Sequence, residues 1–418
     1  MPIDISPRQL HTAVVFGLLF GLGSACHGDT ENLPRFSLRG FGTLGGVYHN
    51  DEGTLFRRDI GQAGGARRDQ VSLVQDSMLG AQLSLFLHEQ FEITAQAISR
   101  LNTENNLNPQ LTWGYVKYKP DEAVSLRIGR LGVDTYMQGD SAQIGYANLP
   151  IRQPITFYPR IFDGMDAEFN HPLGDGTLRL KGFGGWTQGK LIGSLSAGAV
   201  YDTGGSQFLG GIVEYALYGW TGRFSAGQLR MRNEIDTISP GSPELAALQM
   251  LPNGAQIIDV ISQKNREINF QTLAASYDSG PLQGIFSFSF LESAQWPDRT
   301  LLYSHVGYRL GPVTPYISYS SQHGSRPFIS SGLPSGPAFN AINQAALLAQ
   351  SGVFVNQSDL IVGARYDFID NMALKFQVDF MRYKDPESII DADLLTQSAD
   401  RWTTRSLTVF SLALDFVF

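Results

Sequence analysis

Charged side chains recur at alternate positions inside apolar segments of this chain. In "MALKFQVDF", residues 372–380, Lys375 and Asp379 alternate with large apolar residues, and Arg365 does so in "LIVGARYDF", residues 360–368. Alternate residues of a strand face opposite sides of a sheet, whereas a helix would mix these charges into its apolar stripe. Such strands therefore have one apolar face and one face whose charges can attract or repel ions.

The same parity places residues of both charge signs on one face of the expected sheet. They are Glu92, Asp166, Glu168, Arg179, Lys181, Glu214, Arg223, Arg365, Lys375 and Asp379, together with Arg39, Arg100 and Arg127. A water-filled lumen tolerates such a wall, whereas the dry core of a soluble sandwich would lose several kcal/mol for each unpaired ion. Rings of charge select ions only where a passage is narrow, and elsewhere they are solvated or form cross-strand pairs.

The residue pattern does not indicate catalysis. Of the seven histidines only His305 falls on the charged face within a strand, and no serine pairs with a histidine on the apolar face. The Gly-rich "FGTLGG" is not followed by a helix with a lysine, so it does not predict a phosphate site. One cysteine excludes an internal disulfide and a cysteine-based zinc site. We expect no enzyme activity and no cofactor, and the net charge of −8 argues against a nucleic-acid partner.

Persistent alternation predicts sixteen strands, so the expected fold class is all-β. Their ranges are 35–48, 77–88, 90–100, 110–119, 122–131, 162–171, 176–187, 206–218, 219–232, 266–278, 281–292, 300–310, 312–321, 357–369, 371–383 and 404–418. Short turns such as "HEQ", "KPDE" and "IDN" alternate with long connections. Short turns on one rim and long loops on the other are typical of a transmembrane antiparallel barrel. A secreted sandwich or propeller is the alternative fold.

The amino terminus predicts export. Arg8 precedes the apolar "AVVFGLLFGL" and then "GSAC", which together have the organisation of a secretory signal. We expect residues 1–26 to be a signal peptide cleaved near Ala25, and residues 27–418 to form one barrel domain. A buried helix at 13–22 is one alternative, and lipidation of Cys26 is another.

Several segments resemble Gram-negative outer-membrane porins. The final strand carries Phe410, Leu412, Leu414, Phe416 and Phe418 on one face, which matches the signal read by the barrel-assembly machinery in that group. The segments "FSLRGFGTLGGVYHN", "SLRIGRLGV" and "FDGMDAEF" are also similar to porin segments. The resemblance implies outer-membrane location, contact with lipid and lipopolysaccharide, a homotrimer and passive diffusion of small hydrophilic solutes.

The resemblance also implies a constriction. Sixteen-stranded porins fold the loop after the fifth strand into the barrel, and the corresponding segment here is 132–161, with Asp134, Tyr136 and Asp140. Acidic residues of that loop face a basic cluster on the wall in the family, and the matching positions here are Arg39, Arg100 and Arg127. The alternative is that these acids are ordinary surface-loop charges.

Two other long connections have helical patterns, at 242–251 and 340–352. They are expected either to cap the mouth of the barrel or to cover its rim. The sequence leaves three functions open: a general diffusion porin, a substrate-specific channel for an anion or a sugar, and a binding or adhesion barrel.

Overall fold

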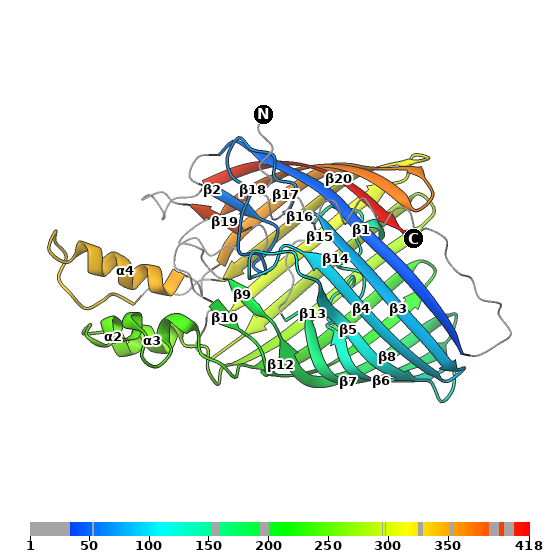
Figure 1. Cartoon of the computed structure of the whole chain (residues 1–418), viewed down its shortest axis with the longest axis horizontal. Coiled ribbons are helices and arrows are strands. Elements are labelled where there is room, and N and C mark those ends of the chain that lie inside the picture. Colours follow the sequence, from blue (N-terminus) through cyan, green and yellow to red (C-terminus); the bar gives the residue numbers. More distant parts are fainter. Residues whose placement is uncertain are drawn as a thin grey trace.

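The computed structural model is a closed antiparallel barrel of sixteen strands (Figure 1). It describes residues 34–51, 54–152, 159–192, 200–294, 296, 298–324, 329–351, 355–383, 393–396 and 405–418. The expected signal peptide, Cys26 and residues 153–158 of the expected constriction loop lie outside these ranges. Each barrel strand pairs with its neighbour in the chain, except where short additional strands intervene in the loops.

All sixteen predicted strands are present, and most boundaries differ by one to three residues. The barrel strands are β1 (Arg35–His49), β3 (Met78–His88), β4 (Phe91–Arg100), β5 (Gln110–Tyr118), β6 (Val124–Gly132), β7 (Ile161–Leu173), β8 (Gly176–Gln188), β11 (Gln207–Leu217), β12 (Trp220–Arg230), β13 (Glu267–Ser279), β14 (Leu282–Glu292), β15 (Arg299–Tyr308), β16 (Val313–Gly324), β17 (Val355–Ile369), β18 (Met372–Tyr383) and β20 (Arg405–Val417).

Alternation separates the two faces of the barrel as predicted. On β18, Phe376 and Phe380 are about half exposed on the outer face, whereas Lys375 and Asp379 are almost fully buried on the inner face. A membrane solvates the outer side chains with hydrocarbon, so their exposure costs nothing there. The outer surface of the barrel is therefore an apolar belt, and the inner surface is largely polar.

The first and last strands close the barrel. The backbone N–H of Gly40 donates to the carbonyl of Phe418 at 2.7 Å, and the N–H of Phe418 donates to Gly40 at 2.8 Å. The ring of Phe416 covers Gly42, where a Cβ would lie only 2.4 Å from the ring. Every strand amide must be paired in hydrocarbon, so this seam removes the last free edge of the sheet.

The long connections lie at one end of the barrel, and three helices project from it (Figure 1). They are α2 (Pro243–Gln249), α3 (Gly254–Ile261) and α4 (Asn340–Ser351). The hydroxyl of Ser242 accepts from Leu245 N at 3.1 Å and caps α2, as the predicted helix start requires. Helix α3 was not predicted. Within the described residues, no helix is both long enough and apolar enough to cross a membrane.

The loops also contain short strands that the alternation did not reveal. Within the connection 189–206, β9 (Lys190–Ile192) pairs with β10 (Val200–Asp202). Strand β2 (Thr54–Arg57) pairs with β19 (Asp393–Thr396), which joins the first long connection to the last. These elements lie at the end of the barrel from which the helices project (Figure 1).

Candidate functional site

The connection between β6 and β7, here called loop 3, enters the lumen. Near its start, Asp134 Oδ2 lies 2.8 Å from Arg179 and 3.1 Å from Lys181, while Oδ1 lies 3.0 Å from Arg223. These three cations are on β8 and β12, on the inner wall. Burial alone would raise the pKa of Asp134, but the positive charges of Lys181, Arg223 and Arg179 lower it to about 2. Asp134 therefore anchors loop 3 to the wall as a carboxylate.

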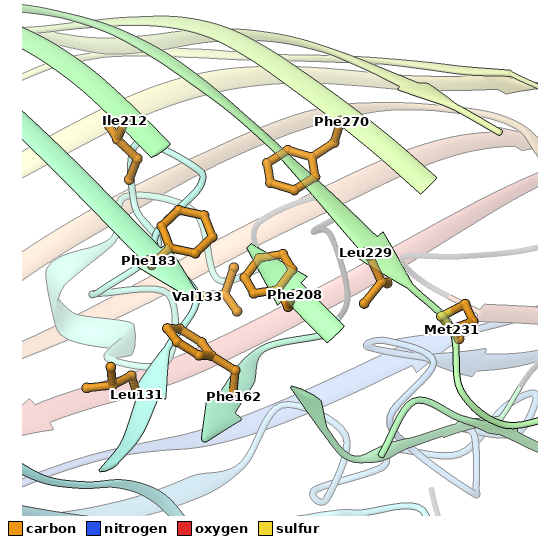
Figure 2. Packing of buried hydrophobic residues seen from close by; sticks show 9 residues of the cluster. All are labelled: Leu131, Val133, Phe162, Phe183, Phe208, Ile212, Leu229, Met231 and Phe270. Carbon is orange, nitrogen blue, oxygen red and sulfur yellow. The ribbon is translucent and has the colours of Figure 1, made fainter. Parts of the chain in front are cut away.

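An aromatic cluster on the inner wall supports this anchor (Figure 2). Phe162, Phe183 and Phe208 pack with Val133 of loop 3, and Phe208 stacks on Phe270 with ring centroids 5.9 Å apart. Tyr136 packs against the same cluster. Where loop 3 leaves β6, it packs on this apolar surface. The packing orients Asp134 toward the cations.

The remaining charges of this wall are paired as well. Arg127 makes a two-pronged ion pair with Asp166, at 2.9 and 2.5 Å. Arg179 also lies 2.9 Å from Glu168, and Arg223 lies 2.5 Å from Glu214. This half of the wall is a network in which opposite charges neutralise each other locally.

The middle of loop 3 crosses to the opposite side of the lumen. Lys375 of β18 donates to the carbonyls of Gly145 and Asn148, at 2.8 and 2.5 Å, and pairs with Asp415 of β20 at 2.8 Å. Arg365 of β17 donates to the carbonyl of Tyr146 at 2.6 Å and lies over its ring. The loop is thus held by both walls and narrows the passage between them.

Arg152 fixes the returning part of loop 3. Its guanidinium donates to Asp76, Asp379 and Ser411, which belong to the first long connection, β18 and β20. It also lies 4.9 Å from the ring centroid of Phe56. An arginine can satisfy two carboxylates at once because its donors form a planar fork.

Asp140 is the acid of loop 3 that reaches the lumen. It is exposed and lines a pocket of about 60 Å³, together with Arg58, Arg100, Trp113 and Arg160. Desolvation, followed by repulsion from Asp134, raises the pKa of Asp140. This carboxylate therefore takes up a proton at a higher pH than an ordinary aspartate does.

The expected partners of the loop acids need correction. We expected Asp134 and Asp140 to face Arg39, Arg100 and Arg127, but Asp134 pairs with Arg179, Lys181 and Arg223. Arg127 pairs with Asp166, and Arg100 lies 3.6 Å from Asp59 in the first long connection. Arg39 is exposed near the rim of the short turns, far along β1 from that pocket. Asp140 shares a pocket with Arg100, and the positive charge of Arg127 acts on its carboxylate.

The other predicted residues lie on the faces that parity assigned. Glu92 is on the inner face of β4, where its carboxylate accepts from Thr94 at 2.6 Å. Of the last-strand residues, Phe410, Leu412 and Phe418 are exposed on the outer face, Leu414 is half-buried and Phe416 is buried on Gly42. Their role in assembly stays a prediction.

Several residues of the site were missed. Asp59, Asp76 and Arg152 lie in connections, where alternation says nothing about direction, and Asp415 was not among the predicted wall residues. The sequence shows only that these charges stand in segments that also carry large apolar residues such as Phe56.

No family model matches the sequence, and no curated protein matches it. Solved structures match over nearly the whole chain. The outer-membrane channel DcaP of Acinetobacter baumannii has a TM-score of 0.52 at 10% identity, over 94% of this chain and 100% of that one. OmpF of Salmonella typhi, in complex with daunomycin, has a TM-score of 0.52 at 10% identity, over 92% and 98%. The anion-selective porin of Comamonas acidovorans has 0.51 at 14% identity, over 92% and 100%.

The expectation that this chain is not an enzyme is withdrawn. A form of OmpT with a loop deletion, an outer membrane protein of Vibrio cholerae, also matches, with a TM-score of 0.50 at 9% identity, over 92% of this chain and 99% of that one. Likeness at such identity shows the fold alone, and this fold is compatible with more than one activity. The enzymatic status of the chain is therefore open.

These comparisons confirm the expected transmembrane β-barrel, and the apolar outer belt agrees with the expected location in the outer membrane. The chain therefore has the fold of the outer-membrane porins, a closed sixteen-strand barrel with a long loop folded into its lumen.

Proposed function

We propose that this protein is a porin that lets small hydrophilic solutes and ions diffuse across the outer membrane. The observation that carries the proposal is the path of loop 3, which is bound to β8 and β12 at one end and to β18 and β20 further on. A loop held across a barrel of this size narrows the lumen, and a narrow, charged passage selects solutes by size and charge.

The named constriction residues remain part of this proposal. Asp140 and Arg100 border the pocket beside the loop, with Tyr136 packed behind. Close partners neutralise the charges of Asp134, Arg127 and the other paired residues. These residues therefore determine the shape of the wall. We therefore propose weak ion selectivity, in which Asp140 contributes most of the acidic character of the loop.

A homotrimer belongs to the proposal too. A trimer form is described for OmpT of Vibrio cholerae, whose structure matches with a TM-score of 0.50 at 9% identity. Cross-linking of the purified protein in detergent, followed by electrophoresis without heating, tests this assembly.

A substrate-specific sugar channel is the second candidate. Hydroxyl groups line neighbouring strands of the inner wall, including Thr272 and Ser289, which are 2.8 Å apart, and Tyr303, which lies 2.6 Å from His305. Polar groups at fixed positions orient sugars in binding sites.

Swelling of liposomes that contain the purified protein tests both candidates. A general porin admits neutral sugars at rates that fall smoothly with their size. A specific channel admits one sugar class faster than its size predicts, with saturation. If correctly folded protein allows no swelling with any solute, both candidate functions are overturned.

A further inference from the structure

Loop 3 is not the only connection inside the barrel. The first long connection, here called loop 1 and described over residues 54–77, places Phe56 and Ala66 against Val47, Met381 and Val409. Those three wall residues share the inward parity of β1, β18 and β20. Phe56 is fully buried and Ala66 is 2% exposed. Loop 1 is therefore packed on the inner wall, opposite the wall where loop 3 begins.

Loop 1 is tied to the barrel by its backbone. Val47 and Ser72 exchange two hydrogen bonds of 2.9 Å, and Gly45 N donates to the Ser77 hydroxyl at 2.9 Å. A Cβ at Gly45 would lie 2.5 Å from Cβ of Asp76, so this glycine allows the loop to approach the wall closely.

Polar contacts join loop 1 to loop 3. Arg152 of loop 3 pairs with Asp76 of loop 1 and with Asp379 of the wall. Arg58 of loop 1 lies 3.7 Å from the same Asp76, and Arg160 of loop 3 lies 2.9 Å from Asp59. All of these carboxylates are buried, and buried charges need partners.

From this arrangement we propose that loop 1 is a second constriction element and that Arg152 positions loops 1 and 3 as one unit. The inference rests on the proposed diffusion function, and it adds an element that the resemblance to porins did not imply. Without Arg152, the buried carboxylate of Asp379 would face those of Asp76 and Asp359 without their shared cation, and Asp76 would keep the more distant Arg58, at 3.7 Å. Their repulsion would release loop 1 from the wall and widen the passage.

The variant Arg152→Ala tests the proposal, with Arg130→Ala as its matched control. Arg130 pairs with Asp163 at 2.7 and 2.9 Å on the outer face, as its parity with the exposed Ile128 shows. In planar bilayers, we expect Arg152→Ala to raise single-channel conductance about two-fold, since conductance follows the narrowest cross-section. Arg130→Ala should conduct as the parent does.

An engineered disulfide distinguishes the contribution of loop 1 to conductance from that of loop 3. Directly opposed residues of an antiparallel pair lie within disulfide reach. Oxidised Val47→Cys/Ser72→Cys, added to Arg152→Ala, should restore the parent conductance, and reduction should raise it again. If oxidation does not restore it, loop 3 alone controls the opening and the proposal is wrong. The proposal would also be overturned if the parent conducts and Arg152→Ala has the same conductance.

A readout without conductance keeps the test independent of the proposed function. In a Cys26→Ser background, Ala66→Cys is the only cysteine. A membrane-impermeant maleimide should label it slowly in the parent and at least about ten-fold faster with Arg152→Ala, because labelling follows exposure of the thiol. Equal labelling rates would overturn the proposal even if the parent does not conduct, whereas absence of conductance with the expected labelling would overturn only the diffusion function.

Discussion

The carboxylate of Asp134 lies 2.8 Å from the guanidinium of Arg179, so an acid of the inserted loop is embedded in the basic side chains of the wall. Lys181 and Arg223 complete its surroundings. A loop acid and a wall base that face each other across water would create a transverse field. Here the two charges cancel at contact distance, and the field must come from other groups.

Asp134→Asn should shift ion selectivity toward anions. The change leaves Lys181, Arg179 and Arg223 with less compensating charge, and it removes one partner of a buried network, which costs about 3–5 kcal/mol of loop anchoring. Reversal potentials in a salt gradient measure the shift. Asp163→Asn, which alters the outer ion pair with Arg130, is the control and should leave the potential unchanged. A parent-like potential for Asp134→Asn would contradict this assignment.

Selectivity should depend on pH through Asp140. Because the pKa of Asp140 is raised, this group takes up a proton at a higher pH than an ordinary aspartate does. As the pH falls, Asp140 loses its negative charge before an ordinary aspartate would, so preference for cations should decrease. Asp134, with a lowered pKa, stays ionised over that range. In Asp140→Asn, this step should be absent from reversal potentials measured at graded pH. An unchanged step in Asp140→Asn would assign it to another group.

Lys375→Met should destabilise the barrel strongly. Lys375 is fully buried and is the cation beside Asp415, whose carboxylate also accepts from Thr43 at 2.5 Å. Removing one partner of a buried ion pair costs about 3–5 kcal/mol in the free energy of unfolding. The double variant Lys375→Met/Asp415→Leu should recover part of this loss, because no uncompensated charge remains. Urea unfolding in lipid vesicles, followed by tryptophan fluorescence, measures both. Additive losses in the double variant would show that the two side chains are not coupled.

Deletion of Phe418 should reduce the yield of folded barrel. It removes both backbone hydrogen bonds to Gly40 and exposes part of the seam between β1 and β20. Gel electrophoresis with and without heating separates folded from unfolded chains. Leu360→Ala is the control, since Leu360 is an outer-face residue of β17 that is 40% exposed and does not touch the seam. Equal folded yields for the deletion and this control would show that the seam tolerates the loss.

The barrel strands were predictable because alternation is a local property. A strand such as β18 shows its two faces in twelve consecutive residues, and the turns at its ends are short. The seam between β1 and β20 followed from the need to pair every amide in the membrane. Helix α3 was missed because Asn253 makes no side-chain cap and the helix is short, so nothing local distinguishes it from a loop.

The partners within the site were not predictable in the same way. Parity correctly placed Arg127 and Arg179 on the inner wall, but it does not give their height or the path of loop 3. Asp134 meets Arg179 because Val133 packs on the aromatic cluster beside it, which is a tertiary contact. Loop 1 likewise enters the lumen because Phe56 packs on apolar residues of β1, β18 and β20, which are distant from loop 1 or from each other in sequence.

The first measurement to make is the single-channel conductance of the refolded protein in a planar bilayer. A water-filled channel should give large, stepwise openings with weak ion selectivity, in groups of three if the trimer is correct. A correctly folded barrel, shown by its heat-dependent migration, that gives no conductance steps would contradict a water-filled channel.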